Sequence, residues 1–168
     1  MTVSNASYLK GFHESARALG TKVVSSDFTL EIEGHESKFL LCKQAPWPSL
    51  APAGEIEIAG PLGMTSWQPQ QAKVAQQGQI SFYETVGGHS NMMLMDLIAR
   101  GSSAEFNAKI YEGTPQKFIR AVRIQDCFIQ MDPVDRDQEN RSQVLLLSGT
   151  MFYHYFGEII EGNSADYR

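Results

Sequence analysis

The chain has little positive charge, and this shortage limits what it can bind. Its 168 residues include 14 Lys and Arg against 19 Asp and Glu, which gives a net charge of −5 and a pI of about 5.3. Proteins that bind nucleic acid in general carry a basic stripe on one face. The basic run of Lys117, Arg120 and Arg123 alternates with apolar residues, as on the solvated side of a strand. We therefore expect no general affinity for nucleic acid.

Cysteines and long apolar runs are also scarce. The two cysteines, Cys42 and Cys127, lie far apart in apolar, strand-like segments and make no disulfide framework. We predict that both are buried free thiols without redox activity. No run approaches the ~18 apolar residues of a membrane span, and the first residues lack the pattern of a signal peptide. We expect a soluble protein, made in a cytoplasm and not inserted in a membrane.

The sequence has no recognisable catalytic or metal-binding signature. Its four histidines, His13, His35, His89 and His154, show none of the spacings of metal ligands. The acidic segment 132–141 lacks the central glycine and the final glutamate of a calcium loop. We predict no catalytic residue, no cofactor and no metal, and we do not expect an enzyme.

The patterns that are present are those of β-strands. Phe28, Leu30 and Ile32 alternate with polar residues, and an apolar segment returns after Gly34, which predicts a hairpin over 28–44. Further strands are predicted over 65–74, 79–86, 104–113, 115–131 and 142–159. Strands, one helix and then strands again predict a mainly β fold, an antiparallel β-sandwich or barrel with one flanking α-helix.

The flanking helix is predicted over 90–100. Ser90 is its expected N-cap, and Arg100 and Gly101 suit its last turn and the position after it. Its apolar stripe consists of two i,i+4 pairs, Met93 with Leu97 and Leu94 with Ile98.

Two segments outside these strands contain enough apolar residues to need a packing partner. Residues 5–19 have near-helical spacing before Gly20, and they form either a short helix or an extended arm that docks on a neighbour. In segment 45–63, four prolines and three glycines exclude regular structure over most of its length, and such long loops are usually functional. The chain divides into an N-terminal arm or short helix (1–27), a β domain (28–163) and a C-terminal tail (164–168).

A series of segments in a fixed order covers most of the chain. "GEIEIAGPLG" is followed by "QISFYETVGG", a short helix, "FNAKIYEG" and finally "CFIQMDPVDRDQENRSQVLLLSGTMFYHYFGEI". This series resembles the major tail tube protein of contractile-tailed bacteriophages. The resemblance rests on the order of elements and on the closing strand, and it implies a β-sandwich with a flanking helix, related to the Hcp protein of type VI secretion.

The resemblance also implies an assembly. Subunits of this family form hexameric rings that stack into a hollow tube, and the lumen conducts the double-stranded DNA genome during ejection while an outer sheath contracts. The implied partners are further copies of the chain, the tail sheath, the baseplate and the tail terminator, and DNA that passes without specific binding. The implied locations are the tail tube of the virion and, during assembly, the host cytoplasm.

Three sets of residues are expected to serve this assembly. The long loop is expected to stack ring on ring through Trp47, Leu50, Ile56 and Ile58. A long edge strand recruits other strands, so the closing strand is expected to join subunits. Its residues for this role are Val144, Leu146, Phe152, Tyr153 and Tyr155. An acidic lumen repels phosphate, and its expected acids are Glu31, Glu33, Glu84, Glu105 and Asp126.

Two other classes of protein stay open at this point. A secreted Hcp-like tube protein that carries effectors would have the same fold, but its gene would lie among secretion genes. A small-ligand β-barrel or an enzyme would be a monomer with one deep pocket, and a sizing column would separate it from a ring.

Overall fold

The computed structural model describes residues 5–165, and its fold is built on one long strand, β7 (Phe118–Met131). The first half of β7 lies between β6 (Phe106–Gly113) and β9 (Ile159–Glu161). On its other side, β6 pairs with β1 (Thr29–Ile32). We call β1–β6–β7–β9 the first sheet, and every neighbouring pair in it is antiparallel.

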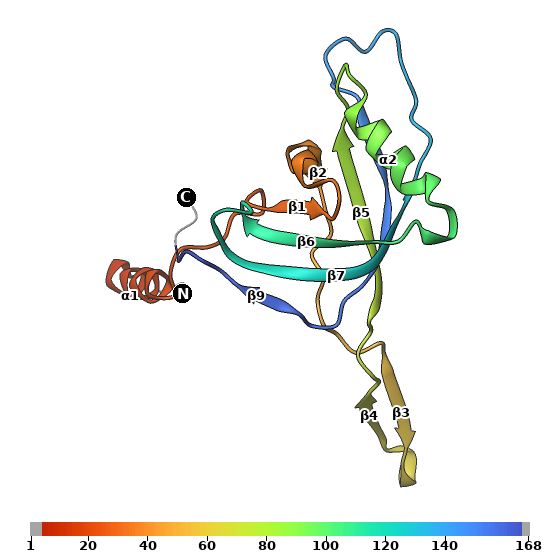
Figure 1. The fold of residues 1–168 in the computed structure, drawn as a ribbon. Helices are drawn as coiled ribbons and strands as arrows, with labels where there is room; N and C mark the ends of the chain where they lie inside the picture. The colour runs from red at the N-terminus through yellow and green to blue at the C-terminus, as the bar shows by residue number, and fades with distance from the viewer. Residues whose placement is uncertain (1–4, 166–168) are drawn as a thin grey trace.

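The second half of β7 belongs to another group of strands. It pairs with β8 (Leu146–His154), which pairs with β5 (Ala75–Tyr83), and β5 in turn pairs with β2 (Cys42–Gln44). We call β7–β8–β5–β2 the second sheet, and its strands cross those of the first sheet at a steep angle (Figure 1). The predicted antiparallel β-sandwich with a flanking helix is confirmed.

A β-bulge lets β7 pass from one sheet to the other. Gln125 lies opposite His154 and Phe128 opposite Phe152, so two residues of β7 face a single residue of β8. Asp126 in this bulge has a φ of 47°, a left-handed conformation that aspartate tolerates better than most residues. Because a bulge bends and twists its strand, the two sheets fold over a common core.

The core lies between the sheets and helix α2 (His89–Ala99). The inward residues of the strands alternate with outward ones, as the sequence predicts. The least exposed of the large side chains are Leu30, Ile80, Phe82, Ile110, Val122, Ile124, Cys127 and Met151. Each fully buried aliphatic or aromatic side chain contributes about 1.5–3 kcal/mol relative to exposure, so these residues hold the two sheets together.

Helix α2 confirms the predicted helix but differs from it in detail. It packs Met93, Leu94 and Leu97 into the core, whereas Ile98 is 57% exposed, so the second predicted pair is wrong. The helix buries the face that also carries Ser90, and Ile98 lies beside that face. Ser90 is not the N-cap either, because Gly88 holds that position and the Ser90 hydroxyl donates to the Tyr83 carbonyl at 2.5 Å.

The predicted hairpin over 28–44 is wrong. β1 and β2 lie in different sheets, and a 3₁₀ segment, η1 (Glu36–Leu41), separates them. β1 pairs instead with β6, and β2 pairs with β5. Alternation predicts that a segment is a strand, but it does not say which of several strands becomes its partner.

The predicted closing strand over 142–159 is two strands. β8 begins at Leu146 and ends at His154, and β9 follows after four residues outside any strand. Both run antiparallel to β7, one on each side of its bulge. The break follows from the bend of β7, since one straight strand cannot pair with both halves of it.

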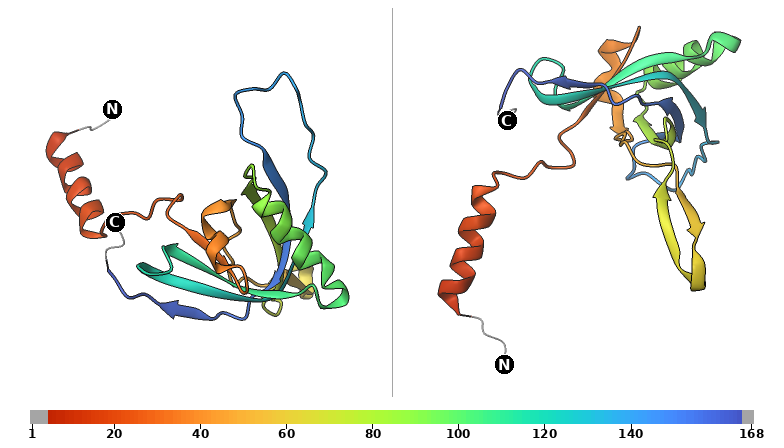
Figure 2. Two further views of the ribbon diagram at one scale, coloured as in Figure 1. Left: turned by 45° about the horizontal axis from the view of Figure 1, so that its top comes forward. Right: turned by 90° about the horizontal axis from the view of Figure 1, so that it is seen from below.

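Two elements project from the sheets, as the right-hand view of Figure 2 shows. Helix α1 (Ala6–Ala18) begins at Asn5, whose side chain accepts a hydrogen bond from the Ser7 N–H, and ends before Gly20 at φ 87°. Strands β3 (Glu55–Ala59) and β4 (Thr65–Pro69) form a hairpin of their own. Segment 45–63 therefore contains regular structure over β3, which the proline and glycine content did not predict.

Short 3₁₀ turns complete the fold. η2 (Pro61–Gly63) forms the tip of the β3–β4 hairpin, where Leu62 and Gly63 both have positive φ. η3 (Gly101–Ser103) follows α2, and Gly101 has a φ of 64°, as predicted for the residue after the helix.

Candidate functional site

The first sheet ends in two strands that have one strand neighbour each. Within residues 5–165, β1 pairs only with β6 and β9 only with β7. Such edges present unpaired backbone groups that recruit further strands. Because successive strands of this sheet are antiparallel, β1 and β9 run in opposite directions. A second copy can therefore continue the sheet by placing its β9 beside β1 in the same antiparallel order.

The strand that the sequence predicted as the joining edge lies inside the second sheet. β8 pairs with β5 along its whole length and with β7 along most of it. Tyr153 and Tyr155 are buried in the core, and Phe152 stacks on Phe128 with ring centroids 4.8 Å apart. The prediction of an edge is wrong, because interior and edge strands share the same alternation. The residues it concerned are Val144, which lies exposed before β8, and Leu146, Phe152, Tyr153 and Tyr155.

The outward face of the first sheet carries a row of charges of both signs. Glu31, Lys109 and Arg123 are direct cross-strand partners and so lie on one face. Arg123 also approaches Glu158, with Nε and Oε2 3.9 Å apart. The Tyr111 hydroxyl donates to Glu31 at 3.3 Å, and burial together with this carboxylate raises the pKa of Tyr111 to about 12. The row is therefore acidic at its ends and basic in its middle.

Four of the five predicted lumen acids gather at the first sheet. Glu31 and Glu33 line one surface hollow, and Glu33 also lines the next one with Glu105 and Asp126. Arg100 lies on that second hollow as well. The basic side chains of Lys109, Arg123 and Arg100 share this surface with the acids.

Glu84, the fifth predicted acid, has a local structural role. It lies after β5, and its carboxylate accepts hydrogen bonds from the backbone N–H groups of Thr85, Ser90 and Asn91 at 2.8–3.1 Å. Desolvation would raise the pKa of Glu84, but these three hydrogen bonds outweigh it and hold the pKa below its ordinary value. The side chain is thus an acceptor at the start of α2, where negative charge is favourable.

The residues predicted to stack between rings fall into two groups. Ile56 and Ile58 are exposed on one face of the β3–β4 hairpin. Trp47 and Leu50 instead lie along the body of the fold, and a Cβ placed on Gly157 would meet the Leu50 side chain at 3.0 Å. An exposed aromatic residue of the hairpin, Trp67, was not in the predicted set, because the strand containing it was not connected with the loop.

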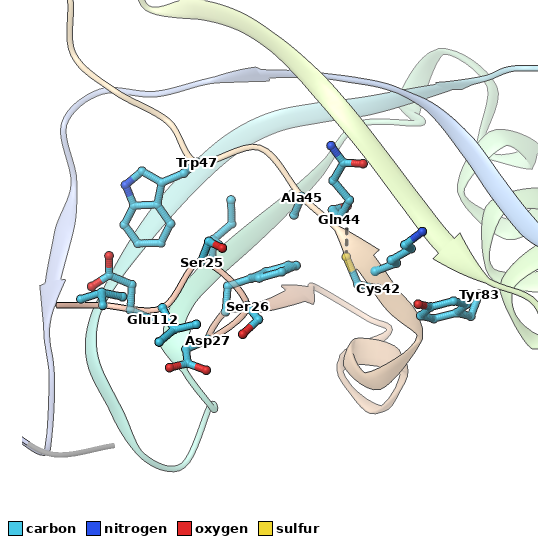
Figure 3. A pocket seen from close by; sticks show the side chains of 14 residues that line it. Ser25, Ser26, Asp27, Cys42, Gln44, Ala45, Trp47, Tyr83 and Glu112 are labelled. Carbon is cyan, nitrogen blue, oxygen red and sulfur yellow. Dashed lines mark hydrogen bonds between the residues drawn. The ribbon is translucent and has the colours of Figure 1, made fainter. Parts of the chain in front are cut away.

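The chain also has an open groove of about 750 Å³ (Figure 3). It lies between the segment before β1 and the edge of β2, and Trp47, Cys42 and Glu112 are among its lining residues. The Glu112 carboxylate accepts from Arg120 Nε at 2.6 Å, and burial raises the pKa of the Cys42 thiol to about 12. The groove thus holds a carboxylate that is paired with Arg120 and a thiol that burial keeps protonated.

Both cysteines are free, as predicted, but their burial differs. Cys127 is fully buried, and burial raises the pKa of its thiol to about 12. Cys42 is only partly covered. Over the described part of the chain, no three His, Cys, Asp or Glu side chains are placed to hold a metal ion. None of the helices in residues 5–165 has the length and apolar character needed to cross a bilayer.

Comparisons with known proteins identify the fold. No protein-family model and no curated protein match the sequence. Solved structures do match it. A chain of the sheath–tube complex of PVC, an extracellular contractile injection system in its extended state, aligns with a TM-score of 0.58 at 12% identity. The alignment covers 87% of this chain and 95% of that one.

Two chains from the anti-feeding prophage (AFP) agree with this result. One belongs to the tube-terminating cap and aligns with a TM-score of 0.57 at 13% identity, over 83% of this chain and 90% of its own. The other belongs to the baseplate and aligns with a TM-score of 0.54 at 14% identity, over 86% and 99%. The resemblance seen in the sequence is confirmed at the level of the fold: the chain has the Hcp-like tube fold found in contractile injection systems.

Proposed function

We propose that the chain is the structural subunit of a tail-type tube, in which hexameric rings stack around a central channel. The observation that carries this proposal is the first sheet, which has an open antiparallel edge at both ends within a fold shared with tube assemblies. Pairing β9 of each copy with β1 of the next closes six such sheets into one continuous barrel. Closure removes both open edges of the first sheet and so turns a hazard of aggregation into a specific assembly.

The projecting hairpin supports stacking of one ring on the next. Every residue of β3 and β4 is exposed in the single chain, although Ile56, Ile58 and Trp67 are apolar. A two-stranded hairpin without a packed face is marginally stable in water. Contact with the neighbouring ring would bury these side chains and hold the hairpin in place. The tube would then bind sheath, baseplate and terminator proteins on its outside and at its ends.

The outward face of the first sheet would line the channel. Its acids Glu31 and Glu33 repel phosphate, whereas Lys109 and Arg123 attract it, so the two signs largely offset each other along the row. A channel of this kind would let double-stranded DNA slide without holding it. The location that follows is the tail tube of a virion, assembled in the host cytoplasm.

A protein-injecting tube is the second candidate, and one observation favours it. The matching chains come from an extracellular contractile injection system and from the anti-feeding prophage. A channel of mixed charge also suits a protein cargo. The nucleic acid and protein content of particles purified from the producing cell would separate the two candidates.

Negative-stain microscopy of the purified protein tests the tube itself. Rings with six-fold averages, or hollow tubes, are expected, and monodisperse monomers at high concentration would contradict the proposal. The edge is tested by Ile159→Pro in β9. The Arg123 N–H donates to the Glu158 carbonyl, so by alternation the Ile160 N–H bonds to β7 and the Ile159 N–H points to the open side of the strand. Proline at position 159 removes this outward donor and interrupts pairing with a further strand. This variant is expected to remain folded and to form no rings. Gln138→Pro, in the loop before β8, is the matched control and is expected to assemble normally. Normal rings from Ile159→Pro would show that β9 is not the joining edge.

A further inference from the structure

The proposed joining edge, β9, has little to hold it in place by itself. It has three residues, and within residues 5–165 it pairs only with β7. None of its side chains is buried, and Ile159 is 63% exposed. Strands with few buried contacts and exposed hydrogen bonds are the first to open locally. An edge that recruits the next copy therefore needs a hold beyond its own three ladder positions.

The backbone groups that β9 offers depend on its register with β7. The Arg123 N–H donates to the Glu158 carbonyl at 3.2 Å. Because the backbone groups of successive residues point alternately to the two sides of a strand, Ile160 bonds to β7. The N–H and C=O groups of Ile159 and Glu161 point to the open side. These groups can pair with β1 of another copy only while β9 stays in register on β7.

The two residues after β9 attach it to the turn between β6 and β7, toward which the chain runs (Figure 1). The Asn163 Oδ1 accepts a hydrogen bond from the Phe118 N–H at 3.1 Å, and its Nδ2 donates to the Gln116 carbonyl at 2.6 Å. Gly162 permits this approach, because a Cβ there would overlap the backbone carbonyl oxygens of Phe118 and Ile119. We call Gly162 and Asn163 the β9 clamp.

The turn does not depend on the clamp for its own structure. The Thr114 N–H donates to the Lys117 carbonyl at 2.9 Å, and the Lys117 N–H donates to the Thr114 carbonyl at 3.2 Å. The turn also joins β6 and β7, whose ladder holds both of its ends. It is thus the fixed partner, and the hydrogen bonds of Asn163 hold β9. Asn163 is exposed, so its truncation opens no cavity in the core.

The hold at the other end of β9 is weaker. The Gln125 Nε2 donates to Glu158 Oε1 at 3.2 Å, and Arg123 Nε lies 3.9 Å from Glu158 Oε2. Both partners of this ion pair are about half exposed, and such pairs contribute little. The clamp is therefore the principal side-chain hold on β9.

We propose that the β9 clamp is the positioning element for ring closure. It holds β9 on β7 before a second copy arrives, with the outer backbone groups of Ile159 and Glu161 ready to pair with β1 of that copy. Holding a segment in its bound conformation removes the cost of ordering it on contact. Copies with β9 detached cannot pair, so the apparent affinity between copies falls with the attached fraction. The inference rests on the proposed tube, since it names the residues that prepare the joining edge.

Asn163→Ala tests the clamp by two measurements. In dilute, unassembled protein, the exchange rate of the Ile160 amide hydrogen should rise about tenfold, because two hydrogen bonds that hold β9 are lost. The Ile110 amide in β6 should exchange as in the wild type. Negative-stain microscopy should show rings only at a several-fold higher protein concentration. An unchanged exchange rate at Ile160, or rings at the wild-type concentration, would overturn the clamp.

Two further variants complete this test. Asn140→Ala is the matched control, because the Asn140 side chain also donates a hydrogen bond, to Gln143 at 2.9 Å, but lies in the loop before β8. It should change neither exchange at Ile160 nor ring formation. Gly162→Ala keeps the Asn163 side chain but displaces β9 from β7, and it should lose rings as Asn163→Ala does. Normal rings from Gly162→Ala would contradict the close approach.

A disulfide that replaces the clamp shows whether holding β9 is its role. Arg120 and Glu161 are cross-strand partners, and by the alternation above they form a non-hydrogen-bonded pair. Such pairs have Cα atoms about 4.5 Å apart, which a disulfide can span. Arg120→Cys with Glu161→Cys, added to Asn163→Ala, should form rings at the wild-type concentration when oxidised and not when reduced. The same cysteine pair with Asn163 intact is the control and should form rings in both states. Failure of oxidation to restore rings would overturn the proposal.

These outcomes distinguish the clamp from the tube. If the wild type and Asn163→Ala form rings equally well, the clamp is overturned and the tube stands. If the wild-type protein never forms rings or tubes, the proposed function is itself overturned, and with it the role of the clamp in ring closure.

Discussion

Two antiparallel strand pairs of this chain, β5–β8 and β3–β4, have similar alternation and opposite surroundings. In β5–β8, nine residues pair in register, and Ile80 and Phe82 are buried to 0% and 1% exposure. In β3–β4, five residues pair and all of them remain exposed, including Ile56 and Ile58. Alternation makes both of them strands. Packing against a second layer makes only one of them part of a stable core.

The difference indicates that the folding stability resides in the sheets and α2, whereas the proposed contacts between stacked rings reside in the projecting elements. The sheets and α2 bury their apolar side chains within the chain, whereas α1 and the hairpin keep theirs exposed. Exposed apolar patches of this kind mark sites of interaction. Substitutions in the body should therefore change the free energy of unfolding, and substitutions in the projections should change polymerisation.

The largest effect is expected in the body. Phe82→Ala removes a ring that is 1% exposed at the centre of the second sheet. Large-to-small substitutions of buried aromatic residues cost about 3–5 kcal/mol through lost burial and the cavity left behind. Urea unfolding of the unassembled protein measures this loss. A loss below about 1 kcal/mol would show that the core does not depend on β5.

A smaller effect is expected where the body meets α2. Glu84→Gln weakens three hydrogen bonds to backbone N–H groups at the start of α2, and loss of such a cap costs about 1 kcal/mol. The pKa of Glu84 is lowered in the folded protein, so its contribution is complete above the ordinary value of 4.5 and is lost as the pH falls through the lowered pKa. The two proteins should differ at pH 7 and converge in acid. A constant difference across this range would contradict the assignment.

A still smaller effect on stability is expected in the hairpin, together with a loss of polymerisation. Ile56→Ser with Ile58→Ser replaces exposed side chains, so the free energy of unfolding should change by no more than about 0.5 kcal/mol. Tube length in micrographs should fall to single rings. Ser66→Ala, on the same face of the hairpin, is the control and should leave long tubes. Unchanged tube length in the double variant would remove the hairpin from the stacking contact.

The smallest effect is expected at the two cysteines. Here the body and the hairpin are compared by the rate at which a thiol reagent labels them. Cys127 and Cys42 have thiol pKa values raised to about 12 by burial, so the reactive thiolate is scarce at pH 7. Labelling of the native protein should be slow at both. A Ser66→Cys variant, with its thiol on the exposed hairpin, should label fast and serves as the positive control. Fast labelling of either native cysteine would show that the body opens readily.

The sequence by itself determined most of the strand segments of the two sheets and the position of the flanking helix, although it missed β3. Alternation along residues 104–113 and 115–131 predicted β6 and β7, and the apolar stripe after residue 90 predicted α2. It also determined the order of elements, which carried the resemblance to tail tube proteins. These features depend on neighbours close in the chain, so a local pattern is sufficient to show them.

Only the tertiary structure decided which strands become partners and which become edges. β1 and β2 are consecutive strands of the chain, yet they lie at opposite ends of the strand order, one in each sheet. β8 is an interior strand, whereas the short β9 is an edge strand. Pairing joins residues far apart in the chain, such as Glu31 and Lys109, and the same alternation is compatible with many partners. The charges on the outward face depend on that register, which is why the mixed row could not be predicted from composition alone.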